Sequence, residues 1–316
     1  MSCPAGEKRS IIAALYPTPG GERLSAARRR MEPKRISDAK QDVTPAPRDW
    51  VQRYLGLLSV EQSAPSPEAL ACLTHAQVGA VLFENVTSIL RRRTHPTGPV
   101  PPVDPEALLD SWERGRGGGV CLELAEMFAR LLVGLGYRAR PVLCHMAFPN
   151  AHQAVLVELG GRRYLADVGA GAPFFEPIPL EGEVEIRRAG LAYRFRPDGA
   201  DGCWVQDRLI VGTWEPFCRY ELRPADPCER EAAYQRHHTP GESWVVDDLT
   251  LIRPGYDEVW ALRRGQLSHF TAEGKRSEPV SVAACTRLAA EVFGMPGLPV
   301  EAALRALAER VPAQTA

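Results

Sequence analysis

Cysteine, histidine and aspartate occur in this 316-residue chain in an order that could perform acyl transfer through a thiol. Cys121 follows the glycine-rich segment 114–120 and opens a predicted helix, whose apolar stripe consists of Leu124, Phe128, Leu131, Leu132 and Leu135. Backbone N–H groups at a helix N-terminus favour negative charge, and therefore the thiolate, which is the nucleophilic form of cysteine. The segment predicts a nucleophile at Cys121; the alternative is a buried structural cysteine.

A tight hairpin is predicted to bring a histidine and an acid together. The sequence Leu-Gly-Gly-Arg at 159–162 is typical of a two-residue Gly-Gly turn, which pairs residue 159 with residue 162. This register places Asp167 opposite Ala154, and His152 points to the same face because it lies two residues earlier. The two side chains then become diagonal neighbours, about 7–8 Å apart at Cα. Such a carboxylate would orient the imidazole; taken singly, each residue could instead be structural.

The composition indicates an ordinary globular chain. Apolar residues make up 45% and charged residues 24% of the sequence. With 38 basic and 39 acidic residues the formal charge is −1, which indicates neither a nucleic-acid nor a membrane partner. No apolar run approaches the roughly 20 residues of a membrane span, and no secretory signal is predicted. The eight cysteines are scattered without a CxxC pair, which favours a cytoplasmic location over a zinc or disulfide framework.

The apolar periodicity changes from helical to extended and back along the chain. Residues 1–46 are polar and rich in Pro and Gly, and are predicted to form a poorly ordered extension. Helices, two of them opened by Ser-Pro-Glu and Asp-Pro-Glu signals, are predicted over 50–58, 67–81, 107–112, 121–135, 281–293 and 300–310. Strands are predicted over 142–145, 153–159, 162–167, 190–195, 204–211, 217–222, 244–252 and 258–263. Helices, then strands, then helices favour an α+β fold.

An ordered set of segments, from about Trp50 to the C-terminus, resembles the arylamine N-acetyltransferase family. Its members carry Arg-Gly-Gly-aromatic-Cys-x-Glu, and here 116–123 reads Arg-Gly-Gly-Gly-Val-Cys-Leu-Glu. Its Pro-Phe-Glu-Asn-Leu segment corresponds to Leu-Phe-Glu-Asn-Val at 82–86. Its strand-opening histidine and Asp-Val-Gly-Phe-Gly segment correspond to His152 and to Asp-Val-Gly-Ala-Gly at 167–171. Thr-Pro and Ser-Trp within 239–244 match the family's lid region more weakly.

The resemblance implies a papain-like cysteine-nucleophile core, with a helical domain over 47–136, a β-barrel domain over 137–235 and an α/β lid over 236–316. It also implies a ping-pong reaction with acetyl-CoA as co-substrate and no metal. Cys121 would carry the acyl group as a thioester and pass it to an arylamine, hydrazine or similar nitrogen. His152 would be the base and Asp167 would orient it. The implied substrate-binding residues are Phe83, Gly118, Gly119, Val120 and Ala170.

Several positions depart from the family pattern. Gly117 stands where the family has Arg, Val120 where it has an aromatic residue, Ala125 where it has Asn, and Ala170 where it has Phe. These changes remove bulk and predict a wider or reshaped pocket. An alternative function is therefore an amide synthase that uses a bulkier or carrier-bound acyl chain, with an acyl carrier protein as partner. A third is a non-catalytic binding protein, against which the retained Cys, His and Asp argue.

Other residues are weaker candidates for a role in the site. His145 is a rival base near a strand end, although the hairpin favours His152. The pair at 237–238 could suggest a metal, but it lacks a carboxylate or cysteine at metal-ligand spacing, so a polar loop is predicted. The arginines at 91–93 are predicted to be a solvated basic stretch, with contact to the phosphates of coenzyme A as the alternative. Phe83 either packs in the core or lines the acceptor pocket.

Overall fold

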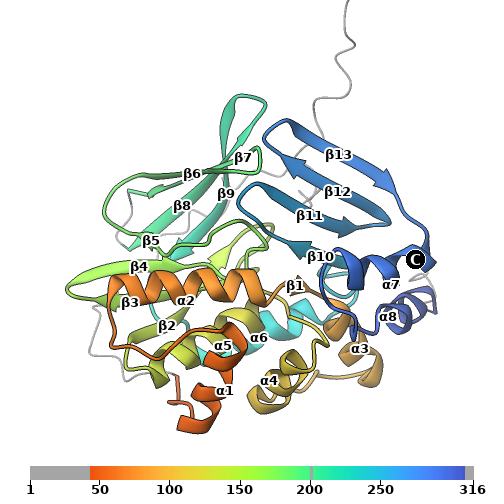
Figure 1. Cartoon of the computed structure of the whole chain (residues 1–316), viewed down its shortest axis with the longest axis horizontal. Helices are drawn as coiled ribbons and strands as arrows, with labels where there is room; N and C mark the ends of the chain where they lie inside the picture. The colour runs from red at the N-terminus through yellow and green to blue at the C-terminus, as the bar shows by residue number, and fades with distance from the viewer. Residues whose placement is uncertain (1–42, 200–201, 310–316) are drawn as a thin grey trace, which may run out of the picture.

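The computed structural model describes residues 43–199 and 202–309, and its N-terminal part is a group of helices (Figure 1). They are α1 (Arg48–Leu58), α2 (Pro67–Ala80), α3 (Val86–Thr94), α4 (Pro105–Glu113) and α5 (Cys121–Gly134). Ser66 Oγ accepts the N–H of Ala69 at 3.0 Å, and Asp104 Oδ1 accepts the N–H of Glu106 at 3.1 Å. Both predicted helix starts are therefore confirmed. Helix α3 is not predicted; its N-cap residue Asn85 makes no capping bond with its side chain.

An eight-stranded antiparallel sheet curves into a barrel-like layer (Figure 1). Its order is β5-β4-β3-β2-β9-β8-β7-β6. The strands are β2 (Arg138–His145), β3 (His152–Leu159), β4 (Arg162–Ala166), β5 (Ile178–Pro179), β6 (Val184–Arg188), β7 (Leu191–Pro197), β8 (Cys203–Ile210) and β9 (Thr213–Glu221). Gly160 and Gly161 have φ values of 58° and 79°, and Leu159 pairs with Arg162. The predicted Gly-Gly turn and its register are confirmed.

A second sheet contains a strand from the helical part of the chain. Its order is β1-β10-β11-β12-β13, with β1 (Phe83–Glu84), β10 (Thr250–Arg253), β11 (Glu258–Arg263), β12 (Gln266–Thr271) and β13 (Gly274–Pro279). Helices α7 (Val282–Glu291) and α8 (Val300–Ala308) follow it and share an apolar cluster with α3. The predicted strand over 244–252 is wrong in its first part. There Asn85 Nδ2 donates to the carbonyl oxygens of Val245 and Asp248, which holds that stretch in a turn.

Helix α5 lies at the centre of the molecule, between the other N-terminal helices and the larger sheet (Figure 1). Its Leu124, Phe128 and Leu131 are fully buried, which confirms the predicted apolar stripe. The predicted extension over 1–46 is too long, since Val43 is buried against this cluster; residues 1–42 lie outside the described ranges. The helix and sheet content confirms the α+β class.

One helix crosses a predicted domain boundary. Helix α6 (Pro227–His237) runs through the division expected at 235/236. It begins with an Asp226 side chain that accepts the N–H of Cys228 at 2.7 Å. The Asp-Pro-x-Glu sequence at 226–229 is the same kind of helix start as those of α2 and α4, so a local signal for α6 was present.

Candidate active site

The candidate nucleophile is the first residue of the central helix. Cys121 opens α5 and is 4% exposed. Just before it, the N–H of Val120 donates to Glu123 Oε2 at 3.1 Å, which closes the first turn of the helix. The backbone N–H groups at a helix N-terminus favour an anion at the thiol. The structure therefore places Cys121 where the sequence expects it, at a helix N-terminus.

The glycine-rich loop before Cys121 is held by β1. Gly119 forms a parallel bridge with Phe83, and the N–H of Glu84 donates to Gly119 O at 3.1 Å. A Cβ atom at Gly118 would lie 1.8 Å from the carbonyl oxygen of Leu82, so only glycine allows this approach. Gly118 and Gly119, which are predicted to bind substrate, pack against the backbone of residues 82–84. Neither of them lines the cavity described below. Their contact with substrate stays a prediction.

The structure brings His152 and Asp167 together at the end of the hairpin. His152 Nε2–H donates to Asp167 Oδ1 at 2.8 Å, and both residues are buried. The second carboxylate oxygen accepts the hydroxyl of Tyr220, also at 2.8 Å. Tyr220 belongs to β9, which meets β2 through the pair with Cys144. Because this pairing joins segments more than 70 residues apart, no local pattern could identify Tyr220 as a neighbour of the acid.

The charges around His152 favour its protonated form. Burial opposes a charge on the ring, but the Asp167 carboxylate and the Cys121 sulfur together raise the pKa of His152 well above its usual value. Since Nε2 faces Asp167, the remaining nitrogen Nδ1 is left for Cys121. An imidazolium beside a sulfur at a helix N-terminus stabilises a thiolate. The arrangement can therefore supply a nucleophile and a proton donor from one pair of residues.

Glycine at position 169 lets the Asp-Val-Gly segment pack directly on the nucleophile. A Cβ atom there would lie 2.7 Å from the Cα of Cys121. The segment that carries Asp167 thus rests on the first residue of α5. This contact limits how far Asp167 can lie from Cys121.

A cavity of about 40 Å³ opens beside Cys121 and His152. Its lining is mainly apolar and aromatic: Phe83, Cys121, Met146, Ala147, Phe148, Ala151, His152, Gly169, Phe217, His237, Trp244 and Val245. Phe83 lines it and contacts Trp244, with ring centroids 5.8 Å apart. Val120 and Ala170 do not line it: they are 0% and 7% exposed and pack in the core. The predicted wider or reshaped pocket stays a prediction.

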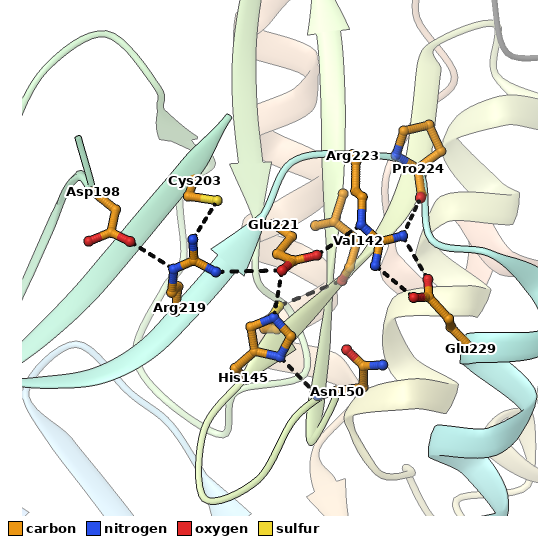
Figure 2. Close-up of polar contacts among 11 residues, drawn as sticks. Val142, His145, Asn150, Asp198, Cys203, Arg219, Glu221, Arg223, Pro224 and Glu229 are labelled. Atoms are coloured by element: carbon orange, nitrogen blue, oxygen red, sulfur yellow. Dashed lines mark hydrogen bonds and ion pairs between the residues drawn. The ribbon is translucent and has the colours of Figure 1, made fainter. Parts of the chain in front are cut away.

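Both ring nitrogens of His145, the rival base, are engaged by partners other than Cys121 and Asp167 (Figure 2). Its Nε2–H donates to Glu221 Oε1 at 2.9 Å, and its Nδ1 accepts the N–H of Asn150 at 3.1 Å. The hydrogen bond from His145, with help from Arg223 and against the cost of burial, lowers the pKa of Glu221 to about 2. Both nitrogens of His145 thus anchor the two ends of the loop 146–151 that lines the cavity.

The histidine pair at 237–238 does not form a polar loop. His237 is the last residue of α6 and His238 follows it, and they are 2% and 0% exposed. His237 lines the cavity and is a site residue that the sequence did not reveal. Across 43–199 and 202–309, no group of three or more His, Cys, Asp or Glu side chains could hold a metal ion.

The arginines at 91–93 are not a uniformly solvated stretch. Arg91 pairs with the buried Glu123 and donates to the Tyr234 hydroxyl. Arg92 is 8% exposed and donates to Gly98 O. Only Arg93 fits the expectation, in an exposed pair near the end of α8. The prediction failed because Glu123 lies 32 residues away in sequence, on the nucleophile helix.

Comparison with known protein families identifies the family of the chain. A family model described as N-acetyltransferase matches residues 67–298, which is more than half of the chain. The chain belongs to this N-acetyltransferase family. The resemblance to arylamine N-acetyltransferases seen in the sequence is thereby confirmed.

Individual family members give the same result. Over 188 residues the chain is 31% identical to the arylamine N-acetyltransferase / N-hydroxyarylamine O-acetyltransferase of Salmonella typhimurium, covering 57% of this chain and 61% of that protein. It is 27% identical over 170 residues to the arylamine N-acetyltransferase of Escherichia coli, covering 51% and 54%. The chain thus spans less than two thirds of the length of each relative.

Solved structures of the family share the fold. The arylamine N-acetyltransferase of Mycobacterium abscessus superposes with a TM-score of 0.72 at 22% identity, covering 84% of this chain and all of that one. The Mycobacterium marinum enzyme in complex with CoA superposes with a TM-score of 0.68 at 23% identity, covering 82% and 97%. Among the described residues of the present family member, every helix is too short or too polar to cross a membrane.

Proposed function

We propose that the chain is an arylamine N-acetyltransferase that works through a Cys121 thioester, with Cys121, His152 and Asp167 as its catalytic triad. The observation that carries this proposal is that one cavity is lined by the thiol at the start of α5, by His152, whose surroundings favour its charged form, and by aromatic side chains. The relatives with about 30% identity are named for transfer to arylamines, and a solved relative binds CoA. Acetyl-CoA and an aromatic amine are therefore the proposed substrates.

The reaction divides into two acyl transfers. In the first, the Cys121 thiolate attacks the acetyl carbonyl carbon of acetyl-CoA, the carbon–sulfur bond to coenzyme A breaks, and the leaving thiolate takes the proton from His152. In the second, the amine nitrogen attacks the thioester while neutral His152 removes its proton, and the Cys121 thiolate leaves. Asp167 keeps the imidazole oriented throughout, and Tyr220 holds Asp167 in place.

The size of the cavity favours acetyl over a long acyl chain. The cavity volume of about 40 Å³ leaves room for a small acyl group beside Cys121. An acetyl group has three non-hydrogen atoms. The bulkier amide-synthase substrate and the acyl carrier partner are not favoured, because the residues expected to make room for them are buried in packing.

The larger architecture suits this proposal. In our assignment, the helices up to α5 and the curved sheet form a papain-like core, in which one part supplies the thiol and the other supplies His152 and Asp167. The β10–β13 sheet with α7 and α8 forms the lid. Asn85 ties the two, since its amide bonds the turn before β10 and its Oδ1 accepts the N–H of Thr250 at 2.7 Å.

The test is mass spectrometry of the intact protein after incubation with acetyl-CoA. Wild type is expected to gain one acetyl group, Cys121→Ala none, and Cys228→Ala, which removes an exposed thiol, one group as in wild type. Adding an arylamine is expected to remove the group and yield the acetylated amine. Acetylation that persists in Cys121→Ala would refute the nucleophile assignment. A Cys121 that resists both acetyl-CoA and alkylation would instead support the binding-protein alternative.

A further inference from the structure

We propose that His237 is a positioning residue that favours the thiolate form of Cys121 through its hydrogen bond to the carbonyl group of Ala151. The inference rests on the proposed function, because it concerns the same nucleophile. His237 is the last residue of α6, lies 85 residues from His152 in sequence, and shares the cavity wall with Cys121, Ala151 and His152. It has no counterpart among the residues that the sequence pattern assigned to the site.

Both ring nitrogens of His237 are engaged in hydrogen bonds. Nε2–H donates to Ala151 O at 3.0 Å, and Nδ1 accepts the hydroxyl of Ser243 at 3.1 Å. Ser243 Oγ in turn accepts the N–H of Val245 at 3.3 Å, so its own proton is free to point at the ring. These partners select one neutral tautomer. His237 therefore has no free lone pair with which to act as a base, which leaves that role to His152.

The environment keeps the His237 ring neutral. Burial, then the neighbouring His238, lowers its pKa to about 3, and His152 and Arg236 act in the same direction. A neutral ring can donate through Nε2 and accept through Nδ1 at the same time, whereas a charged ring would lose the bond from Ser243. The tautomer, and with it the bond to Ala151, is therefore maintained through the pH range in which the nucleophile would work.

The carbonyl of Ala151 is the link to the nucleophile. Its oxygen lies 4.0 Å from Cys121 Sγ, close enough for a weak bond from the thiol, and Ala151 directly precedes His152. A hydrogen bond from the thiol to this oxygen would favour the protonated sulfur, because only the neutral form can donate. The same oxygen also accepts the Nε2–H of His237, and this bond offsets part of the negative partial charge that would hold the thiol proton. His237 thereby favours the thiolate and fixes the backbone from which His152 projects.

The same residue also supports the cavity wall. The ring of Phe148 lies 5.7 Å from that of His237, and the guanidinium of Arg236 lies 4.2 Å from the Phe148 centroid. The end of α6 thus contacts Phe148 within the loop 146–151, while His145 accepts the N–H of Asn150 near the end of the same loop (Figure 2). A role confined to this packing would change stability and leave the protonation of Cys121 unaltered, which allows the two effects to be separated.

The experiment compares His237→Leu, which keeps bulk without a donor, with His237→Gln, whose amide keeps a donor. The rate of alkylation of Cys121 by iodoacetamide is followed against pH, by mass spectrometry of the peptide that contains it, together with the unfolding temperature. In His237→Leu the alkylation profile is expected to move to higher pH, so that the rate on its acidic side falls about two- to tenfold, the range that the loss of one hydrogen bond allows. In His237→Gln most of the wild-type profile is expected to return.

The outcomes separate this inference from the proposed function. Folded Leu and Gln variants that both keep the wild-type profile would overturn the role of His237, whatever the acetyl-CoA experiment shows. If His237→Leu does not fold, His237→Ala takes its place with the same expectation. Failure of the proposed function would appear in wild type itself, as absence of a Cys121 acetyl thioester, and does not depend on either variant.

Discussion

Acid sensitivity of the fold offers a direct measure of the buried His237. Its pKa in the folded chain is about 3, against an ordinary value of 6.5. Below pH 6.5, His237 therefore binds a proton in the unfolded chain but stays neutral in the folded chain. As a result, the free energy of unfolding falls as the pH falls. Between pH 7 and pH 5, the effect acts over the interval of about one and a half pH units that lies below 6.5. At about 1.4 kcal/mol per pH unit, the free energy of unfolding falls by about 2 kcal/mol.

The assay is urea denaturation at pH 7 and pH 5, for wild type and for His237→Gln. Other titrating groups are common to both proteins, so the difference between the two pH-dependences isolates His237. Wild type is expected to lose about 2 kcal/mol more than the variant over this interval. The exposed His75→Gln provides a matched control for the exchange of histidine for glutamine. Equal losses in wild type and His237→Gln would refute the claim that His237 is held neutral by the fold.

Two further predictions concern the loop and the helix that carry the nucleophile. Gly118→Ala is expected to lower the free energy of unfolding by about 1–3 kcal/mol or more, because its Cβ would lie 1.8 Å from a backbone oxygen. Gly56→Ala, in open space on α1, is expected to raise the free energy of unfolding by about 0.5–1 kcal/mol. Urea denaturation of the two variants measures both effects. Arg91→Ala leaves the buried Glu123 without its ion-pair partner and is expected to lower the free energy of unfolding by about 3–5 kcal/mol. The exposed Arg93→Ala is expected to lower it by less than about 1 kcal/mol. Similar shifts of the unfolding temperature in both variants would contradict this prediction.

Local chemistry made a large part of this fold predictable. The caps Ser66 and Asp104 act through bonds to residues two or three positions away, so a short stretch of sequence contains both partners. The Gly-Gly turn fixes the register of β3 and β4 in the same way, and that register is sufficient to place His152 beside Asp167. Each of these features depends on a short segment whose geometry leaves few alternatives.

The features that sequence did not reveal depend on long-range pairing. Tyr220 reaches Asp167 only because β9 joins β2, and β1 enters the second sheet only because Phe83 pairs with Ile252. His237 resembles a surface histidine until α6 is placed against the loop 146–151. The buried ion pair of Arg91 could not be predicted for the same reason. A run of arginines has the same local sequence whether or not a distant acidic residue pairs with one of them.

The family departures around Cys121 illustrate how position in sequence differs from position in the site. Val120 directly precedes Cys121, and Ala170 lies three residues after Asp167, yet both pack in the core and neither lines the cavity beside Cys121. The cavity wall is instead supplied by aromatic residues from four separate segments, among them Phe148, Phe217 and Trp244. Substrate size should therefore respond to exchanges in those segments, while exchanges in the Cys121 motif should act on the placement of the nucleophile.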